Sequence, residues 1–184
     1  MLIYSMSVSV DGFIADREGA FGWGAPSDEL FRFHLARVGE LGGYLLGRRL
    51  YESMLVWETD PSPRDDELGA EFADVWRSLP KVVFSQSLET VDWANARLSR
   101  RPLEDEIPEL KREGGKDMVV FGGARIAHSL IRLGLFDELR LTVHPVALGD
   151  GLPLMHGLPE PQRFTLVSST AYADGCVTQV LRPA

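Results

Sequence analysis

Residues 118–151 constrain the fold most, because this stretch changes its periodicity twice. An apolar strand at 118–121 runs directly into Gly122 and Gly123, a short amphipathic helix follows, and after Gly134 the chain alternates as a strand again. Adjacent glycines between a strand and a helix let a phosphate group approach the free backbone N–H groups of the helix N-terminus. We therefore expect a phosphate site at the glycine pair.

Length and charge exclude several classes of protein. The 184 residues carry 19 Lys and Arg against 27 Asp and Glu, a net charge of −8, and 45% of the residues are hydrophobic. This composition is typical of one globular domain over residues 1–184, and no basic tract of the kind that binds nucleic acid is present. The single cysteine and the four scattered histidines lack the spacing of a metal site. No apolar segment has the length of a membrane span or the pattern of a signal peptide, so we expect a cytoplasmic protein with no membrane partner.

Strand-like and helix-like segments alternate along the first two thirds of the chain. Apolar strands are predicted at 2–10, 44–46, 81–84, 96–98 and 117–121, and helices after Ser27, after Gly47, over 71–78 and from Pro102 to Lys111. The segment 58–70 between them is predicted to be a polar surface excursion. Near the end, two strands flank Asp174-Gly175, which is a strong hairpin signal. This order predicts an α/β fold with a mostly parallel central sheet, helices on both faces and an antiparallel C-terminal hairpin.

Three predicted strands end in residues that suit a phosphate. Gly47, Ser85 and Gly122 each follow a buried strand, and Arg48 and Arg49 come directly after the first of them. In open parallel sheets, ligands bind beyond the carboxyl ends of the strands, so these three ends would form one edge. The chain has no GxGxxG and no Walker A pattern, so neither a standard Rossmann site nor a P-loop is predicted.

Asp28 is a candidate proton donor. It lies in the first turn of the helix after Ser27, on the same side as Phe31 and Leu35. An acid on the apolar side of a helix would have its pKa raised by desolvation, which keeps a proton available. The alternative is that Asp28 is an ordinary surface charge, which the helix dipole stabilises and which pairs with Arg32 at i+4.

Five sequence blocks follow one another in a fixed order. They are MSVSVDGFIA at 6–15, LLGRRLYESM at 45–54, KVVFSQS at 81–87, VVFGGARI at 119–126 and LFDELRLTVHPVALGDGLPLM at 135–155. Together they resemble the dihydrofolate reductase superfamily. The resemblance is closest to the reductase domain of bifunctional riboflavin-biosynthesis proteins and its stand-alone relatives.

The resemblance implies a dihydrofolate reductase-like fold that binds NADPH as hydride donor. The glycine pair would lie beside the pyrophosphate, the segment after the second strand would approach the phosphates, and a serine would lie near the adenosine 2′-phosphate. The implied cofactor-binding residues are Ala15, Gly47, Arg48, Arg49, Leu50, Ser85, Gly122, Gly123, Ala124, Arg125 and Ile126.

The resemblance also bears on the acid and the substrate. Counting from Trp23, the acid of dihydrofolate reductases matches Asp28, with Asp11 as the rival. Met6, Asp11 and Phe31 are the implied substrate contacts. Leu50 stands where dihydrofolate reductases usually have Thr, and no arginine matches the one that holds the folate tail, which favours the riboflavin-type relatives.

The sequence thus predicts an NADPH-dependent reductase that acts on a small heterocyclic or sugar-linked substrate, pteridine- or pyrimidine-like. Within this class, 5-amino-6-(5-phosphoribosylamino)uracil reductase and dihydrofolate reductase are the named activities. The alternatives from other classes are a non-catalytic nucleotide-binding protein and an interaction module. The last includes a homodimer joined through the strand at 136–146.

Overall fold

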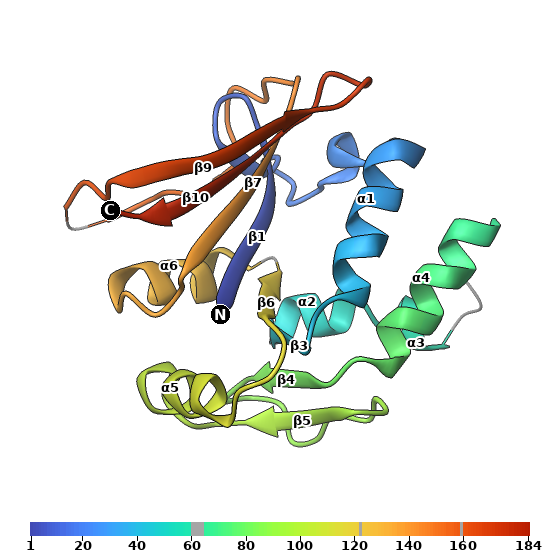
Figure 1. Ribbon diagram of the computed structural model, residues 1–184, viewed down its shortest axis with the longest axis vertical. Helices are drawn as coiled ribbons and strands as arrows, with labels where there is room; N and C mark the ends of the chain where they lie inside the picture. The colour runs from blue at the N-terminus through green and yellow to red at the C-terminus, as the bar shows by residue number, and fades with distance from the viewer. Residues whose placement is uncertain (60–64, 122, 159) are drawn as a thin grey trace.

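The computed structural model describes residues 1–59, 65–121, 123–158 and 160–184. Within these residues, eight strands form one sheet with β1 (Leu2–Ser9) near its middle (Figure 1). The sheet runs in the order β5 (Ala96–Ser99), β4 (Lys81–Phe84), β3 (Gly43–Gly47), β6 (Met118–Phe121), β1, β7 (Glu138–His144), β10 (Val177–Pro183) and β9 (Phe164–Ala171). All neighbours from β5 to β7 are parallel, while β10 is antiparallel to both β7 and β9. The predicted mostly parallel sheet with a C-terminal hairpin is confirmed.

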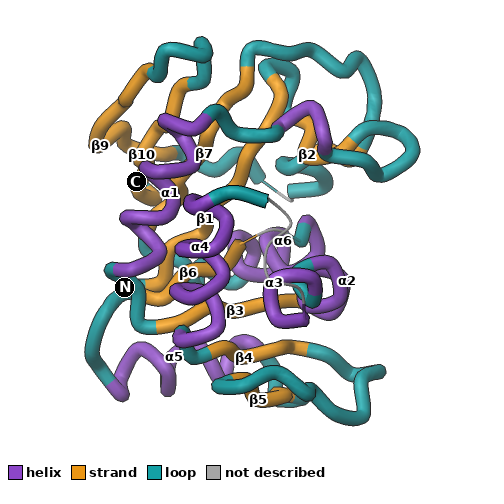
Figure 2. The backbone as a smooth tube through the Cα atoms, turned by 90° about the vertical axis from the view of Figure 1, so that its right-hand side faces the viewer, coloured by secondary structure: helices purple, strands orange, loops and turns teal. Residues whose placement is uncertain are grey.

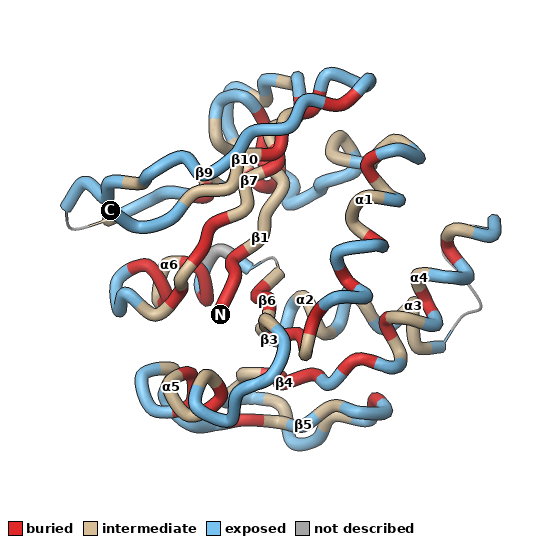
Figure 3. Tube along the Cα trace, in the orientation of Figure 1, coloured by how far each residue is buried: buried red, intermediate tan, exposed pale blue. Residues whose placement is uncertain are grey.

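Helices cover both faces of this sheet, as predicted. One face carries α1 (Asp28–Gly39) and α4 (Glu67–Ser78), which lie toward the viewer in Figure 2, and the other carries α5 (Leu103–Glu113) and α6 (Ala124–Arg132). Alternation along β1 separates two hydrophobic cores, because Ile3 packs with the α1 side while Leu2 and Tyr4 pack with the α6 side. Buried residues concentrate in β1, β3, β4 and β6, whereas β9 is exposed along almost its whole length (Figure 3).

The prediction for 58–70 and 71–78 was wrong in its boundaries. Helix α3 (Val56–Thr59) precedes the undescribed residues, and α4 begins at Glu67 rather than at residue 71. The start of α4 is set by Asp66, whose Oδ1 accepts a hydrogen bond from the backbone N–H of Gly69 at 2.8 Å. An aspartate N-cap followed by an acidic first turn stabilises a helix start. Some of the polar residues that were assigned to a surface excursion therefore begin a helix instead.

Strand β7 cannot join two copies of the chain through its edge. Its backbone pairs with β1 on one side and with β10 on the other. Backbone pairing of β7 with a second copy is therefore excluded, and a homodimer through the strand at 136–146 stays a prediction.

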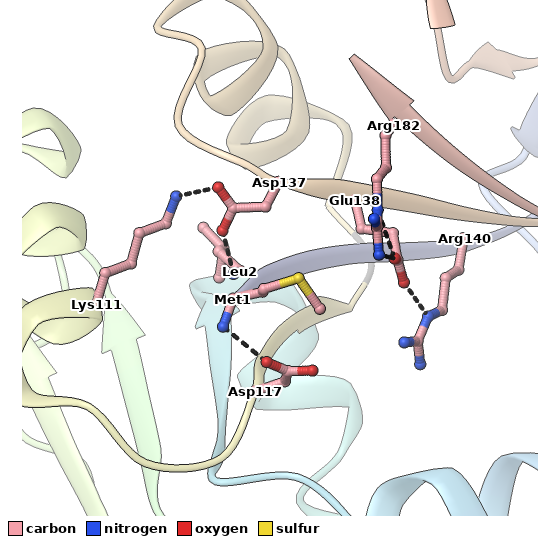
Figure 4. Close-up of polar contacts among 8 residues, drawn as sticks. All are labelled: Met1, Leu2, Lys111, Asp117, Asp137, Glu138, Arg140 and Arg182. Atoms are coloured by element: carbon pink, nitrogen blue, oxygen red, sulfur yellow. Dashed lines mark hydrogen bonds and ion pairs between the residues drawn. The ribbon is translucent and has the colours of Figure 1, made fainter. Parts of the chain in front are cut away.

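A polar network holds the amino ends of the central strands together (Figure 4). Asp137 accepts from the backbone N–H of Leu2 at 2.7 Å and from Lys111 Nζ at 2.8 Å, and the Met1 amine lies 2.7 Å from Asp117. Burial alone would raise the pKa of Asp137, but the bonds from Lys111 and Leu2 lower it on balance. The carboxylate of Asp137 therefore fixes where β1 enters the sheet.

Glu138 is the most buried charge in this network, at 3% exposure (Figure 4). Arg140 Nε donates to its Oε1 at 2.8 Å, and Arg182 Nη2 donates to its Oε2 at 3.1 Å. Replacing Glu138 with Gln removes the charge between two cations, and we expect the free energy of unfolding to fall by about 2 kcal/mol, less than for a fully buried pair because Arg182 is half exposed. Urea denaturation, monitored by circular dichroism, measures this change in the free energy of unfolding.

The matched control is Glu160→Gln, since Glu160 is an exposed glutamate in a loop. We expect that variant to stay within about 0.5 kcal/mol of the wild type. Equal free energies of unfolding for the two variants would show that the ion pairs of Glu138 contribute nothing to stability.

Candidate functional site

The carboxyl ends of β4, β3 and β6 lie side by side. Strand β3 pairs in parallel with β4 and with β6, and Gly47 is directly opposite Phe84. Ser85 follows Phe84, so it lies next to Gly47 at the same edge. Gly122 lies outside the described residues, but β6 ends at Phe121, directly before it. The edge predicted from three separate strand ends is therefore present.

Helix α2 (Arg48–Ser53) starts at this edge and presents Arg48 to it. Gly47 is the N-cap residue, with an extended backbone, and α2 begins without a side-chain cap. Arg48 Nη1 donates to Ser87 Oγ at 3.0 Å, and its Nε donates to Glu52 Oε1 at 2.7 Å. Arg49 is exposed, whereas Leu50 packs against the core on the α1 side. The guanidinium of Arg48 is thus held beside the end of β4.

The turn after β4 is held by a serine hydroxyl. Ser85 Oγ accepts from the backbone N–H groups of Ser87 and Leu88 at 3.2 and 3.1 Å. Arg100, which follows the carboxyl end of β5, donates to the carbonyl oxygen of Leu88 at 2.6 Å. Sequence reasoning missed Arg100. The available signal was its place two residues after the strand predicted at 96–98, which pairs with β4 in the structure.

Gly123 connects β6 to α6 in a conformation that suits glycine. Its φ is +75°, and an added Cβ would lie 3.2 Å from Cγ2 of Ile126. Its carbonyl oxygen accepts from the N–H of Ala127 at 3.1 Å, so Gly123 is the N-cap and Ala124 the first residue of α6. Arg125 is exposed, and Ile126 packs into the core on the α6 side. Only the backbone of Ile126 can therefore take part in ligand contacts at this edge.

Asp11 holds two loops together at the end of β1. Its carboxylate accepts from Ser9 Oγ at 2.6 Å and from the backbone N–H groups of Leu148 and Gly149, the latter at 2.7 Å. The bonds from Ser9 and Gly149 lower the pKa of Asp11. At neutral pH the carboxyl group is therefore ionised, and its oxygens are engaged by these three donors.

Ala15 lies at the end of a short second sheet. Strands β2 (Phe13–Ala15) and β8 (Leu152–Pro153) pair, and the loop between β7 and β8 passes close to Ala15. A Cβ on Gly151 would come within 2.1 Å of the Ala15 carbonyl oxygen. Glycine at 151 thus permits the approach that buries Ala15 to 6% exposure.

The candidate acid Asp28 and the implied substrate contacts do not all lie on one face of the sheet. Asp28 is the first residue of α1 and is exposed, so the desolvation expected from its helical phase is not present. The ring of Phe31 is half-buried, 5.7 Å from that of Phe72 on α4. Met6 packs with the core on the α6 side, the opposite face of the sheet from Phe31.

The face of β1 and β7 that is turned toward α1 is polar, which sequence reasoning missed. Ile3 packs with the α1 side, so alternation places Ser5, Ser7 and Ser9 on that face. Their partners across the parallel register are Arg140, Thr142 and His144. Thr142 in turn shares a hydrogen bond of 2.9 Å with Thr178 of β10. The pairing of strands distant in sequence, and not any local pattern, creates this face.

Two surface hollows lie away from the strand-end edge. One, of about 410 Å³, is a groove between α1 and α4 that includes Arg32, Leu35 and Glu71. The other, of about 430 Å³, lies between the loops around Arg17 and Asp150, which form a salt bridge. Across the described ranges, no cluster of His, Cys, Asp and Glu is able to hold a metal ion. The helices among those residues also include none that could cross a bilayer.

Comparisons with known sequences match nearly the whole chain. The family model described as the RibD C-terminal domain matches residues 1–178. The uncharacterised protein YyaP of Bacillus subtilis (strain 168) is 30% identical over 178 residues, which is 96% of this chain and 91% of that protein. YwjB of the same organism, also uncharacterised, is 24% identical over 96% of this chain and 95% of its own length.

Solved structures of similar shape cover the whole chain. A putative riboflavin biosynthesis protein from Shewanella sp. PV-4 superposes with a TM-score of 0.79 at 23% identity, over 100% of this chain and 98% of that one. A Thermotoga maritima protein, described as a diaminohydroxyphosphoribosylaminopyrimidine deaminase/5-amino-6-(5-phosphoribosylamino)uracil reductase, superposes with a TM-score of 0.70 at 17% identity. That superposition covers 100% of this chain and 56% of the Thermotoga chain. At such identities the likeness shows the fold.

Proposed function

The chain belongs to the RibD C-terminal domain family, and on this premise we propose that it is an NADPH-dependent reductase. Its substrate would be a small heterocyclic or sugar-linked molecule with a C=N or C=O bond. The observation that carries the proposal is the common edge of β4, β3 and β6, where Arg48 is held against Ser87. A reductase-like role also agrees with the family and with the reductase-type neighbours in fold.

The residues at this edge fit a dinucleotide phosphate on two counts. Gly123 offers backbone without a side chain at a helix N-terminus, where N–H groups and the helix dipole favour an anion. Arg48 and Arg100 bring positive charge to the turn at Ser85–Ser87 in a chain whose net charge is −8. We propose that these arginines hold the adenosine 2′-phosphate and that Gly123 holds the pyrophosphate.

NADPH, when bound, supplies the hydride. The chain's own residues would hold the donor and the acceptor in contact and exclude water. On the polar face of β1, Ser5 and Ser7 would offer hydroxyl groups to the acceptor. We propose that Asp28 supplies or relays the proton, since the carboxylate of Asp11 is engaged by Ser9 and two backbone N–H groups.

The test is a fluorescence titration with NADPH, followed by a panel of acceptors. The first acceptor is 5-amino-6-(5-phosphoribosylamino)uracil, because the Thermotoga protein is described as its reductase, and dihydrofolate is the second. We expect tight NADPH binding and oxidation of NADPH by the pyrimidine. Binding without oxidation by any acceptor would favour a non-catalytic nucleotide-binding protein. No binding of NADPH would favour an interaction module and reject the reductase.

Arg48→Met tests which phosphate the strand-end edge recognises. Loss of a charge-assisted hydrogen bond to a phosphate should weaken NADPH binding about tenfold or more and leave NADH binding unchanged. Arg37→Met is the matched control, because Arg37 is an exposed arginine of α1 that pairs with Glu40 at 3.4 Å. Equal losses for NADPH and NADH would place Arg48 away from the 2′-phosphate.

A further inference from the structure

An acidic side chain shares the guanidinium of Arg48 with the turn after β4. Glu52, near the end of α2, accepts from Nε of Arg48 through its Oε1 at 2.7 Å. Ser87 Oγ accepts from Nη1 of the same guanidinium at 3.0 Å. Two segments of the chain therefore fix the orientation of Arg48, and one of them does so with a negative charge.

Most of the donors of Arg48 stay open to a ligand. A guanidinium carries five N–H groups, and the bonds to Glu52 and Ser87 use one N–H each. The remaining N–H groups have no partner among the residues that the structure describes. The side chains of Arg48 and Glu52 are 52% and 46% exposed, so a phosphate has access to these donors. A phosphate bound there would share one cation with the carboxylate of Glu52.

A stabilising role within α2 explains this pair poorly. Arg48 is the first residue of α2, and Glu52 lies one residue before its end. The helix dipole favours acids at the N-terminus and cations at the C-terminus, so each charge lies at the unfavourable end. Arginine before glutamate at i,i+4 is also the weaker of the two orders. The place of the pair, beside the carboxyl end of β4, is therefore its more informative property.

The second arginine at this edge has no acidic partner. Arg100 Nη2 donates to the backbone carbonyl oxygens of Leu88 and Glu89, at 2.6 and 3.5 Å. Within the described part of the chain, no carboxylate forms an ion pair with Arg100. Arg100 thus presents its full charge to the turn at Ser85–Ser87, whereas the charge of Arg48 is offset by Glu52.

We propose that Glu52 is a specificity-determining residue, which weakens the binding of the adenosine 2′-phosphate because it shares the guanidinium of Arg48 with that phosphate. This inference rests on the proposed function, since it takes the 2′-phosphate to lie at Arg48. Two anions on one partly exposed cation repel each other modestly. The edge then prefers NADPH over NADH by less than its arginines alone would allow. Both redox states of the dinucleotide also leave more readily, because both carry the same 2′-phosphate.

The first experiment is calorimetry with adenosine 2′-monophosphate, which carries the phosphate but no nicotinamide. Glu52→Gln removes the charge and keeps an amide oxygen that accepts from Nε of Arg48. We expect its Kd to fall about threefold below that of the wild type. Binding of adenosine, which has no phosphate, should be unchanged. The gain should largely disappear in about 1 M NaCl, where the Debye length is about 3 Å.

Three further variants separate this effect from a general change in charge. Glu40→Gln is the matched control, because Glu40 is an exposed glutamate that pairs with Arg37 of α1 at 3.4 Å, and its Kd should stay that of the wild type. Glu52→Asp keeps the charge on a shorter side chain and should not tighten binding. The double variant Arg48→Met with Glu52→Gln should bind like Arg48→Met alone, since Glu52 acts through the guanidinium.

The second experiment follows the bound phosphate by ³¹P nuclear magnetic resonance. A free phosphate monoester loses its second proton with a pKa of about 6. Nearby arginines lower this pKa because they favour the dianion, and Glu52 opposes them. The pKa of the bound 2′-phosphate should therefore be lower in Glu52→Gln than in the wild type. A role of Glu52 in helix stability alone would leave the pKa of the ligand unchanged.

Four results would overturn the inference: no binding of adenosine 2′-monophosphate, an unchanged or raised Kd in Glu52→Gln, an equal gain in Glu40→Gln, or an unmoved pKa of the bound phosphate. Failure of the proposed function looks different. If the nucleotide binds with this dependence on Glu52 while no acceptor is reduced by NADPH, the inference stands and the reductase is rejected.

Discussion

Replacing Gly123 with valine is expected to abolish NADPH binding. The backbone here must approach the pyrophosphate, and a side chain would stand between the helix N-terminus and the anion. Loss of two charge-assisted hydrogen bonds corresponds to at least roughly a 100-fold weaker affinity. The added Cβ would also crowd Cγ2 of Ile126 at 3.2 Å. Fluorescence titration with NADPH measures the effect, and unaltered affinity would disprove the placement of the pyrophosphate at Gly123.

The backbone strain of a valine at positive φ could by itself weaken NADPH binding. The control variant must therefore carry the same strain at another glycine. Gly134 has φ +61°, follows the other end of α6 and has no atom within 4 Å of an added Cβ. A valine in this conformation is unfavourable by roughly 1–2 kcal/mol at either glycine. We expect Gly134→Val to lower stability in urea to a similar degree and to bind NADPH as the wild type does.

Asp28→Asn is expected to leave NADPH affinity nearly unchanged and to lower the rate of hydride transfer about 100-fold. An amide of the same shape cannot supply a proton, whereas the contacts of α1 with the sheet remain. Single-turnover oxidation of bound NADPH by the pyrimidine acceptor measures the rate. An unchanged rate would remove Asp28 from the mechanism.

The neighbouring acid gives a close control. Glu29 also lies in the first turn of α1 and is exposed, but its carboxylate accepts from the N–H of Ala173 in the hairpin turn. Glu29→Gln should keep its rate within about twofold of the wild type, because the side chain only fastens the helix. Equal losses in both variants would point to a general effect of charge at the helix start.

The parts of the fold that were predictable depend on local chemistry. Ser27 reads as an N-cap in the sequence, and in the structure its Oγ accepts from the N–H of Leu30. Strands β3 and β4 are short runs that end at a glycine and before a serine, so their carboxyl ends at Gly47 and Ser85 were clear. Parallel pairing then brings such ends to one edge whatever the strand order.

The missed parts depend on contacts between distant segments. Cys176 and His144 are 32 positions apart, and only the antiparallel pairing of β10 with β7 brings them together. Helical phase placed Asp28 on the apolar side of α1, but phase cannot tell whether anything covers that side at the first turn. Met6 shared a sequence block with the implied substrate contacts, yet alternation along β1 turns it to the other face.

The central position of β1 has a consequence for how the chain is made. Both of its neighbours come late, since Leu2 pairs with Met118 and Ile3 pairs with Glu138. At roughly 5–20 residues per second, a ribosome needs on the order of ten seconds to add the partners of a strand that left it first. During that interval the unpaired edges of an apolar strand are open to other nascent chains. We therefore expect the yield of folded protein in the cell to depend on chaperones that bind the emerging N-terminal segment.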